Sequence, residues 1–294
     1  MRPLAWIALA LLASCSTTPV PSTPAQVAHV DDAGAPPDAW APAEDAGALP
    51  LPPAAIERSP HVALGVPRDA DPSNDLVLDK GEFVLSYDGA RSVTHWVAWR
   101  LRASDLGRLK RSDRFYEDPF LPAGVRRVQP HDYARSGYDR GHLCPSADRT
   151  ASHEANLTTF VMTNVQPQLH DLNAGPWEAL EAWSRDQVRG GAKELYVVAG
   201  GVFGAAPQKI GAGVPVPDRS FKVIVALDPG KGPADVRPAT PTVAVLMPNV
   251  HGIKERPWTD YATSIAEVER ATGYRFFDKV PAAELARERV TKAP

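Results

Sequence analysis

The feature that most limits how this chain can fold is a proline- and alanine-rich segment between residues 16 and 58. It holds nine prolines and eleven alanines among 43 positions and few large apolar side chains. Such a composition cannot bury enough apolar surface to offset the entropy of ordering it, so we expect a disordered tether. Apolar periodicity begins only near residue 60 of the 294, which leaves core material for one domain, over residues 59–294.

Residues 1–14 have the pattern of an export signal. Arg2 precedes an apolar stretch, Leu4–Ala13, that is too short to span a bilayer but has the length of a signal-peptide core. The stretch ends in Leu12-Ala13-Ser14-Cys15, which resembles a bacterial lipobox, where the signal is cut and the cysteine receives diacylglycerol. An ordinary signal peptide in which Cys15 is incidental is the alternative.

The lipobox resemblance implies an exported protein that is held at the bacterial cell envelope only by lipid on Cys15. Because Ser16 rather than aspartate follows the anchor, sorting rules favour the outer membrane. The chain has only two cysteines, so acylation of Cys15 would leave Cys144 without a partner for an intrachain disulfide.

The formal charge of −3 is unevenly distributed along the chain. Residues 1–58 hold two arginines and six acidic residues, and the remainder holds 30 basic and 29 acidic residues. Residues 100–150 alone carry eleven basic and seven acidic residues. This local surplus can meet a phosphate backbone, although a solvated charged face gives the same composition.

The strand and helix patterns predict an α+β or α/β domain with helices packed on a central antiparallel or mixed sheet. Aromatic and β-branched runs on either side of Asp88-Gly89 predict a hairpin. The expected strands are Leu76–Leu78, Phe83–Tyr87, Thr94–Trp99, Glu194–Ala199, Phe221–Leu227 and Thr242–Met247. Helices are expected over Ala174–Val188, opened by Gly175-Pro176, and over Thr259–Thr272, closed by Gly273.

Two blocks of sequence carry the chemistry. The first is Asp139-Arg140-Gly141-His142, and the second runs from Thr163 through Asn173 and Trp177 to Glu181. Together they resemble the signature of the DNA/RNA non-specific endonucleases, the family of mitochondrial endonuclease G. The resemblance covers most of residues 75–280. It implies a ββα-metal nuclease fold with a central, mostly antiparallel sheet flanked by helices.

Hydrolysis of a phosphodiester needs an activated water and neutralisation of charge on phosphorus. A neutral imidazole can accept a proton from water, so His142 is the expected general base. The resemblance makes Asn173 the metal ligand, and its carbonyl oxygen suits Mg²⁺, with Mn²⁺ as an alternative. With spacings of four and eight residues, Asn173, Trp177 and Glu181 would lie near one side of a helix.

The remaining site residues have supporting roles in this interpretation. Arg140 would clamp phosphate oxygens, and Arg114 resembles a second family arginine. Glu181 would hold metal-bound water or pair with an arginine, the alternative being a carboxylate on the helix surface. Three further residues are expected to shape the site. Asp139 would orient the signature loop through hydrogen bonds with backbone or arginine groups, and Gly141 would permit close approach of the backbone. Asn164 would position the metal loop or cap a turn. Trp177 is expected in the core.

The leading functional hypothesis is a metal-dependent, sugar-non-specific endonuclease that contacts the backbone of DNA and RNA without sequence specificity. A phosphodiesterase for small nucleotides and a catalytically inactive nucleic-acid-binding lipoprotein are the alternatives. A zinc site at His142-Leu143-Cys144, with His131, His153 or His170, is disfavoured because no second cysteine pair exists. The sequence makes no prediction of oligomeric state.

Overall fold

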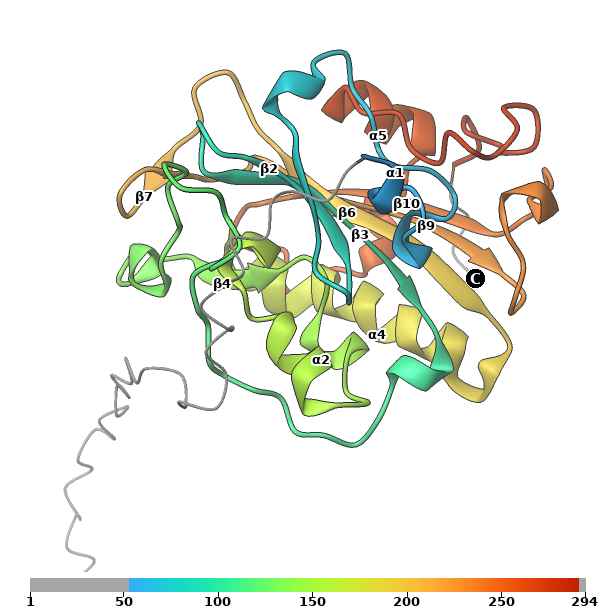
Figure 1. Ribbon diagram of the computed structural model, residues 1–294, viewed down its shortest axis with the longest axis horizontal. Helices are drawn as coiled ribbons and strands as arrows, with labels where there is room; N and C mark the ends of the chain where they lie inside the picture. The colour runs from blue at the N-terminus through green and yellow to red at the C-terminus, as the bar shows by residue number, and fades with distance from the viewer. Residues whose placement is uncertain (1–52, 291–294) are drawn as a thin grey trace, which may run out of the picture. The chain divides into compact units, whose positions relative to one another are not determined.

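The computed structural model describes residues 53–290, and these form one domain around a six-stranded sheet (Figure 1). Every neighbouring pair of strands is antiparallel, in the order β1-β2-β3-β6-β9-β10. The strands are β1 Leu76–Asp79, β2 Val84–Asp88, β3 Val93–Leu101, β6 Glu194–Val202, β9 Arg219–Leu227 and β10 Thr242–Pro248. All six strands expected from the sequence are therefore confirmed, as is the α+β class.

Both faces of the sheet are covered, because its strands carry apolar side chains on both sides. On one face Val97 and Ile224 pack with Trp177 and Leu180. On the other, Val223 packs with Ile265 and with residues before the first strand. In Figure 1 these layers appear as α4 (Glu178–Val188) below the sheet and α5 (Ile265–Thr272) above it.

The long connection between β3 and β6, residues 102–193, holds both sequence blocks of the predicted site. It contains a two-stranded antiparallel hairpin of β4 and β5, which lies apart from the main sheet. The elements of this connection include β4 Asp139–His142, α2 His153–Thr158, β5 Val165–Gln168, α3 His170–Leu172, an irregular helical turn Asn173–Trp177, and α4. Hairpin, turn and helix together form the ββα unit that the sequence predicted.

The helix expected over Ala174–Val188 begins later than predicted. Gly175 has φ −125° and ψ −120°, which is not helical, and regular helix starts at Glu178. A Cβ on Gly175 would lie 2.7 Å from the carbonyl oxygen of Lys254, so the loop after β10 approaches the turn closely. Asn173 and Glu181 therefore do not share one continuous helix, and the prediction from their spacing was wrong.

The substitution Gly175→Ala distinguishes the two descriptions of this segment. In a continuous helix alanine would stabilise the protein by roughly 1 kcal/mol relative to glycine. In the structure the added methyl group overlaps backbone, so we expect destabilisation by about 1–3 kcal/mol in denaturant unfolding. Gly232→Ala is the control, because nothing lies within 4 Å of a Cβ there. Equal stability of the two variants would contradict the close approach of Lys254.

The second expected helix, Thr259–Thr272, also starts later. Trp258–Tyr261 form a 3₁₀ turn, and Ser264 caps α5 by accepting a hydrogen bond from the backbone of Glu267. The predicted closure is confirmed, since Gly273 follows α5 with φ 80° in the left-handed region.

The folded unit begins before the expected boundary at residue 59. A short helix, α1 (Pro53–Ile56), places Ile56 in the core with 3% exposure. Glu57 forms an ion pair with Arg68 at 2.6 Å. Because residues 16–58 contain few large apolar side chains, the sequence did not indicate that Ile56 would be buried.

Two shorter strands, β7 (Lys209–Ile210) and β8 (Val214–Pro215), form a separate pair. In the described part of the chain, no helix has the length and apolarity needed to cross a membrane. The predicted signal peptide and Cys15 lie outside the described residues.

Candidate active site

The first sequence block forms strand β4, which pairs with β5 from Asp139 opposite Gln168 to His142 opposite Val165. A Cβ on Gly141 would overlap the side chain of Gln168, so glycine permits the close packing of this hairpin. Side chains alternate along a strand, which puts Arg140 and His142 on the same side of β4.

Asn164 fixes the chain directly after His142. Its side chain is fully buried and accepts a hydrogen bond from the backbone N–H of Cys144 at 2.9 Å. Its amide nitrogen donates to the carbonyl oxygens of Cys144 and Thr159, both at 2.8 Å. Asn164 thus holds the loop that follows β4 in place.

His142 lies in an aromatic setting and is only 7% exposed. Its ring is 4.8 Å from that of Phe160 in an edge-on arrangement and 5.2 Å from that of Phe115. Its Nε2 is buried and has no hydrogen-bond partner in the structure. A buried ring nitrogen without a partner is available to a water or substrate group that enters the site.

Two arginines contact the same aromatic rings. The guanidinium of Arg140 lies 4.5 Å from the centre of the Phe115 ring, and that of Arg111 lies 5.2 Å from the Phe160 ring. The sequence predicts Arg114 as the second arginine of the site and does not indicate Arg111, three positions earlier. All three arginines are exposed, and the charges that act on His142 are those of Arg111 and Arg140. The family role given to Arg114 stays a prediction.

Burial and positive charge keep the imidazole of His142 neutral. Burial, followed by the charges of Arg111 and Arg140, lowers the pKa of His142 from 6.5 to about 3. A neutral ring is the form that can accept a proton. Since the unfolded chain binds a proton more readily, His142 reduces folding stability as the pH falls below about 6.5 towards the folded-state value.

NMR of the ¹³C- and ¹⁵N-labelled histidines tests this environment. We expect the His142 ring to stay neutral from pH 8 down to pH 5 in the folded protein, with the signal assigned by comparison with His142→Gln. In urea the same residue should titrate at about pH 6.5, the value for a histidine in an unfolded chain. A midpoint above 6 in the folded protein would contradict the buried position between two arginines.

A polar cluster occupies the start of β4. Asn173 donates from Nδ2 to Oδ2 of Asp139 at 3.0 Å, and Nδ1 of His170 lies 2.9 Å from the same oxygen. Nζ of Lys254 lies 3.4 Å from Nε2 of His170. The partners of Asp139 are therefore side chains of the second block, in place of the backbone or arginine groups expected from the sequence.

The donor atoms of this cluster fit a hard cation. The hydrogen bond to Asp139 engages the amide nitrogen of Asn173, which leaves its carbonyl oxygen for a metal, and the Asp139 carboxylate lies beside it. Oxygen ligands of this kind suit Mg²⁺, which keeps several waters. Among residues 53–290, no three His, Cys, Asp or Glu side chains are grouped as a metal site. Cys144 is a free, buried thiol whose pKa is raised by burial.

Glu181 points from α4 towards β9 of the main sheet and does not lie on the helix surface. It forms an ion pair with Lys222 of β9 at 3.2 Å, with side-chain exposures of 11% and 1%. Burial raises the pKa of Glu181, and the Lys222 charge lowers it. The helix-surface alternative is therefore wrong, and its ion-pair partner is a lysine in place of the expected arginine.

Trp177 connects the second block to the first. It is 1% exposed, as expected for a core residue, and its Nε1 donates to the carbonyl oxygen of His142 at 3.2 Å. No hydrogen bond or ion pair joins the side chains of His142 and Asn173 in the described structure. The two are held relative to each other by β4 and by the turn that carries Trp177.

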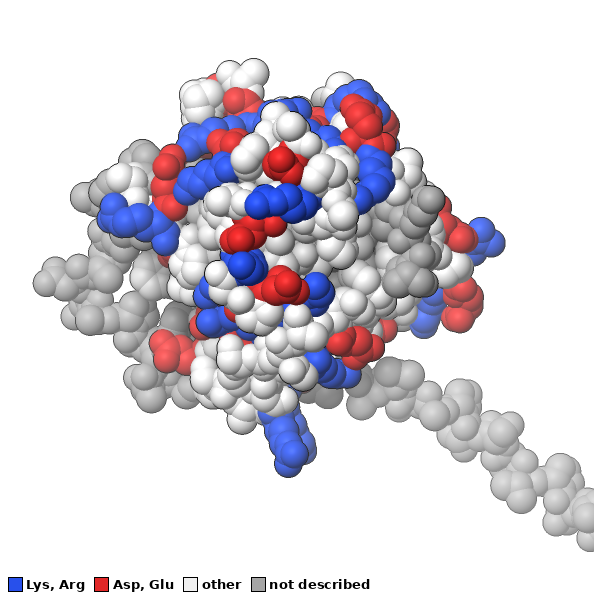
Figure 2. Space-filling model, turned by 90° about the vertical axis from the view of Figure 1, so that its right-hand side faces the viewer, with Lys and Arg blue, Asp and Glu red and all other residues white. Residues whose placement is uncertain are grey.

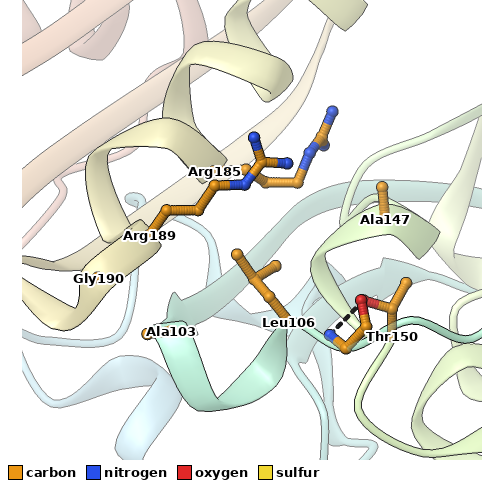
Figure 3. Close-up of a pocket in the computed structure, with 8 residues that line it drawn as sticks. Ala103, Leu106, Ala147, Thr150, Arg185, Arg189 and Gly190 are labelled. Atoms are coloured by element: carbon orange, nitrogen blue, oxygen red, sulfur yellow. Dashed lines mark hydrogen bonds between the residues drawn. The ribbon is translucent and has the colours of Figure 1, made fainter.

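A separate cavity of about 360 Å³ contains none of the predicted site residues. Figure 3 shows Arg185 and Arg189 extending from the C-terminal end of α4, with Leu106 and Thr150 across from them. It is lined by Ala103, Leu106, Gly107, Ala147, Thr150, Arg185, Arg189 and Gly190. The face on the right-hand side of Figure 1 carries interspersed basic and acidic side chains (Figure 2).

The fold and site together define a ββα-metal nuclease. The hairpin carries a neutral histidine beside two arginines, and the following turn and helix carry the amide of Asn173 and the buried carboxylate of Glu181.

The comparisons with known proteins give the family. The model of the DNA/RNA non-specific endonuclease family matches residues 66–283. A nuclease of Nostoc sp. is 41% identical over 227 residues, covering 76% of this chain and 82% of that protein. The human mitochondrial endonuclease G is 31% identical over 212 residues, covering 67% of this chain and 68% of that protein.

A solved structure agrees with these sequence relatives. A chain in the crystal structure of the EndoG/EndoGI complex, a structure of EndoG inhibition, matches this chain with a TM-score of 0.66 and 28% identity. The match covers 78% of this chain and 94% of that chain. The protein belongs to the DNA/RNA non-specific endonuclease family and is an endonuclease.

Proposed function

We propose that the protein is a metal-dependent, sugar-non-specific endonuclease that hydrolyses phosphodiester bonds in both DNA and RNA. His142 is the general base, Asn173 holds Mg²⁺, and the family resemblance implies products that carry a 5′-phosphate. The observation that carries the proposal is the neutral, buried imidazole of His142 with an unpartnered Nε2 on the signature strand.

The two arginines connect substrate binding to the basicity of His142. In the free protein their charges lower the pKa of His142. A phosphodiester placed between Arg111 and Arg140 brings a negative charge that offsets theirs, which raises the proton affinity of the ring. His142 then takes the proton of the attacking water only when substrate is present. The guanidinium groups meanwhile bind the non-bridging oxygens.

The oxygen donors of Asn173 and Asp139 would hold the metal ion on the other part of the site. When bound, Mg²⁺ neutralises charge that develops on the phosphate and on the leaving oxygen. Asp139 keeps the amide of Asn173 oriented, and His170 keeps the carboxylate of Asp139 in place. None of these groups reads a base edge, which favours cleavage without sequence specificity.

The two alternative functions share this fold and differ from the proposed one in substrate or in activity. A phosphodiesterase for small nucleotides would use the same centre but leave a long polymer uncut. An inactive binding protein would need the loss of a catalytic group, whereas His142, Arg140 and Asn173 are all present. Internal cleavage of a polymer therefore separates the hypotheses.

Cleavage of supercoiled plasmid and of a long RNA by residues 53–294 tests the proposal. We expect nicking of both polymers with Mg²⁺ or Mn²⁺ and none with EDTA. Asn173→Ala should lose most of this activity at low Mg²⁺, because it removes the oxygen ligand. Intact polymers under every metal, with hydrolysis of a small phosphodiester, would support the alternative substrate.

His142→Ala provides the matched test of the base. We expect turnover to fall by roughly 10²–10⁴-fold, the usual contribution of general acid–base catalysis. Binding of nucleic acid in EDTA should be nearly unchanged, because phosphate contacts come from Arg111 and Arg140. An equal loss of binding would indicate a structural histidine.

The proposed location is the bacterial cell envelope, with the lipid on Cys15 as the only membrane anchor and the outer membrane as the destination. The support is the lipobox-like Leu12-Ala13-Ser14-Cys15 after an apolar stretch of signal-peptide length. The described domain begins at residue 53, so residues 16–52 would separate the enzyme from the lipid.

Phase partition in Triton X-114 tests the anchor in a bacterial host with a lipoprotein pathway. We expect the full-length protein in the detergent phase and Cys15→Ala in the aqueous phase, because the acyl chains supply the membrane affinity. Cys144→Ala is the control and should partition like the wild type. A wild-type protein in the aqueous phase would refute lipidation.

A further inference from the structure

Lys222 is a buried cation in a strand of otherwise apolar neighbours. It lies in β9 between Phe221 and Val223 and is 1% exposed. Its Nζ lies 3.2 Å from Oε1 of Glu181 and 4.0 Å from the centre of the Trp177 ring. A charge is retained in a protein interior only when it is paired, so these contacts define what Lys222 does.

The contact with Trp177 leads directly to the catalytic strand. The indole Nε1 donates to the carbonyl oxygen of His142 at 3.2 Å, while the ammonium of Lys222 lies over the same ring. The Trp99 ring, 5.7 Å from the ammonium, is a second aromatic neighbour. A desolvated cation attracts the face of an indole and restrains its tilt. The position of the His142 backbone therefore depends on Lys222 through one intervening ring.

Lys222 also contacts a second residue of the predicted site, Glu181. The Lys222 charge favours the ionised carboxylate, which burial disfavours. Asp148, itself paired with Arg185 at 3.2 Å, adds a like charge that acts on Glu181. Lys222 and Arg185 thus balance two buried carboxylates between β9 and α4.

We propose that Lys222 is a positioning residue for the catalytic centre. It holds the Trp177 ring that fixes the carbonyl of His142, and it holds the carboxylate of Glu181 in the same layer. The inference rests on the proposed function, because it assigns the effect to turnover at His142. Since Lys222 is out of reach of substrate, its loss should change kcat and leave KM for nucleic acid unchanged.

The test compares Lys222→Met with Lys80→Met in the protein from residue 53 onward. Lys80 is a matched control: it is 6% exposed, pairs with Asp118 at 2.6 Å and lies 4.9 Å from the Phe120 ring. Both variants lose a buried ion pair and should be less heat-stable. Only Lys222→Met should lose kcat, by about 10- to 100-fold, which is the effect of displacing a catalytic group. Lys222→Arg should recover part of it.

A spectroscopic readout keeps the test independent of stability. The indole N–H resonance of Trp177, assigned by comparison with Trp177→Phe, should shift in Lys222→Met and not in Lys80→Met. If Lys222→Met does not fold, the double variant Lys222→Met/Glu181→Gln removes the unpaired charge. Its kcat should then be below that of Glu181→Gln alone, because the support of Trp177 is still missing.

Two results would overturn the inference: equal kcat in the two methionine variants, or an unshifted Trp177 indole resonance in Lys222→Met. A wild-type protein that cuts no polymer would refute the proposed function instead. In that case the indole resonance alone decides whether Lys222 holds the ring.

Discussion

The position of His142 depends on hydrogen bonds to its own backbone and to the residues that follow it. Its own carbonyl oxygen accepts the indole N–H of Trp177, and the next residues are held by the buried amide of Asn164. A two-stranded hairpin is only marginally stable in water, so β4 needs these attachments to the core. The ring of His142 lies beside Phe115 and Phe160, and its Nε2 has no hydrogen-bond partner in the structure.

Charge is arranged in two layers around this strand. The exposed Arg111 and Arg140 lie beside the rings that surround His142, and their charges add to burial in keeping its imidazole neutral. In the interior, Lys222 of β9 and Glu181 of α4 form a buried ion pair. Removing one partner of such a pair leaves an uncompensated charge in the interior. We infer that the pair constrains the arrangement of β9 and α4 more than it contributes to substrate affinity. In the proposed mechanism the arginines bind substrate, and the buried ion pair holds the groups that support β4.

Much of the fold and the two signature blocks could be predicted from the sequence, because strand patterns and motifs are local. The errors have long-range causes. Gly175 adjoins Lys254, 79 positions later, so the helix break there could not be read from local helix signals. Ile56 is a single apolar residue in a proline-rich context. That Arg111 lies against the aromatic rings around His142 depends on the position of Phe160, which local sequence does not indicate. Lys222 did leave a signal, as the one lysine in the apolar run Phe221–Leu227.

The site lies in the connection between two neighbouring strands, but its supports come from later in the chain. Lys222 belongs to β9, and Lys254 to the loop after β10 that packs on the turn of Asn173. During synthesis from the N-terminus, the residues of the two signature blocks therefore emerge well before the groups that hold them. Pairing of distant segments is also the slow part of folding. A chain that ends before β9 would carry the residues of both signature blocks without the groups that hold them in the folded structure.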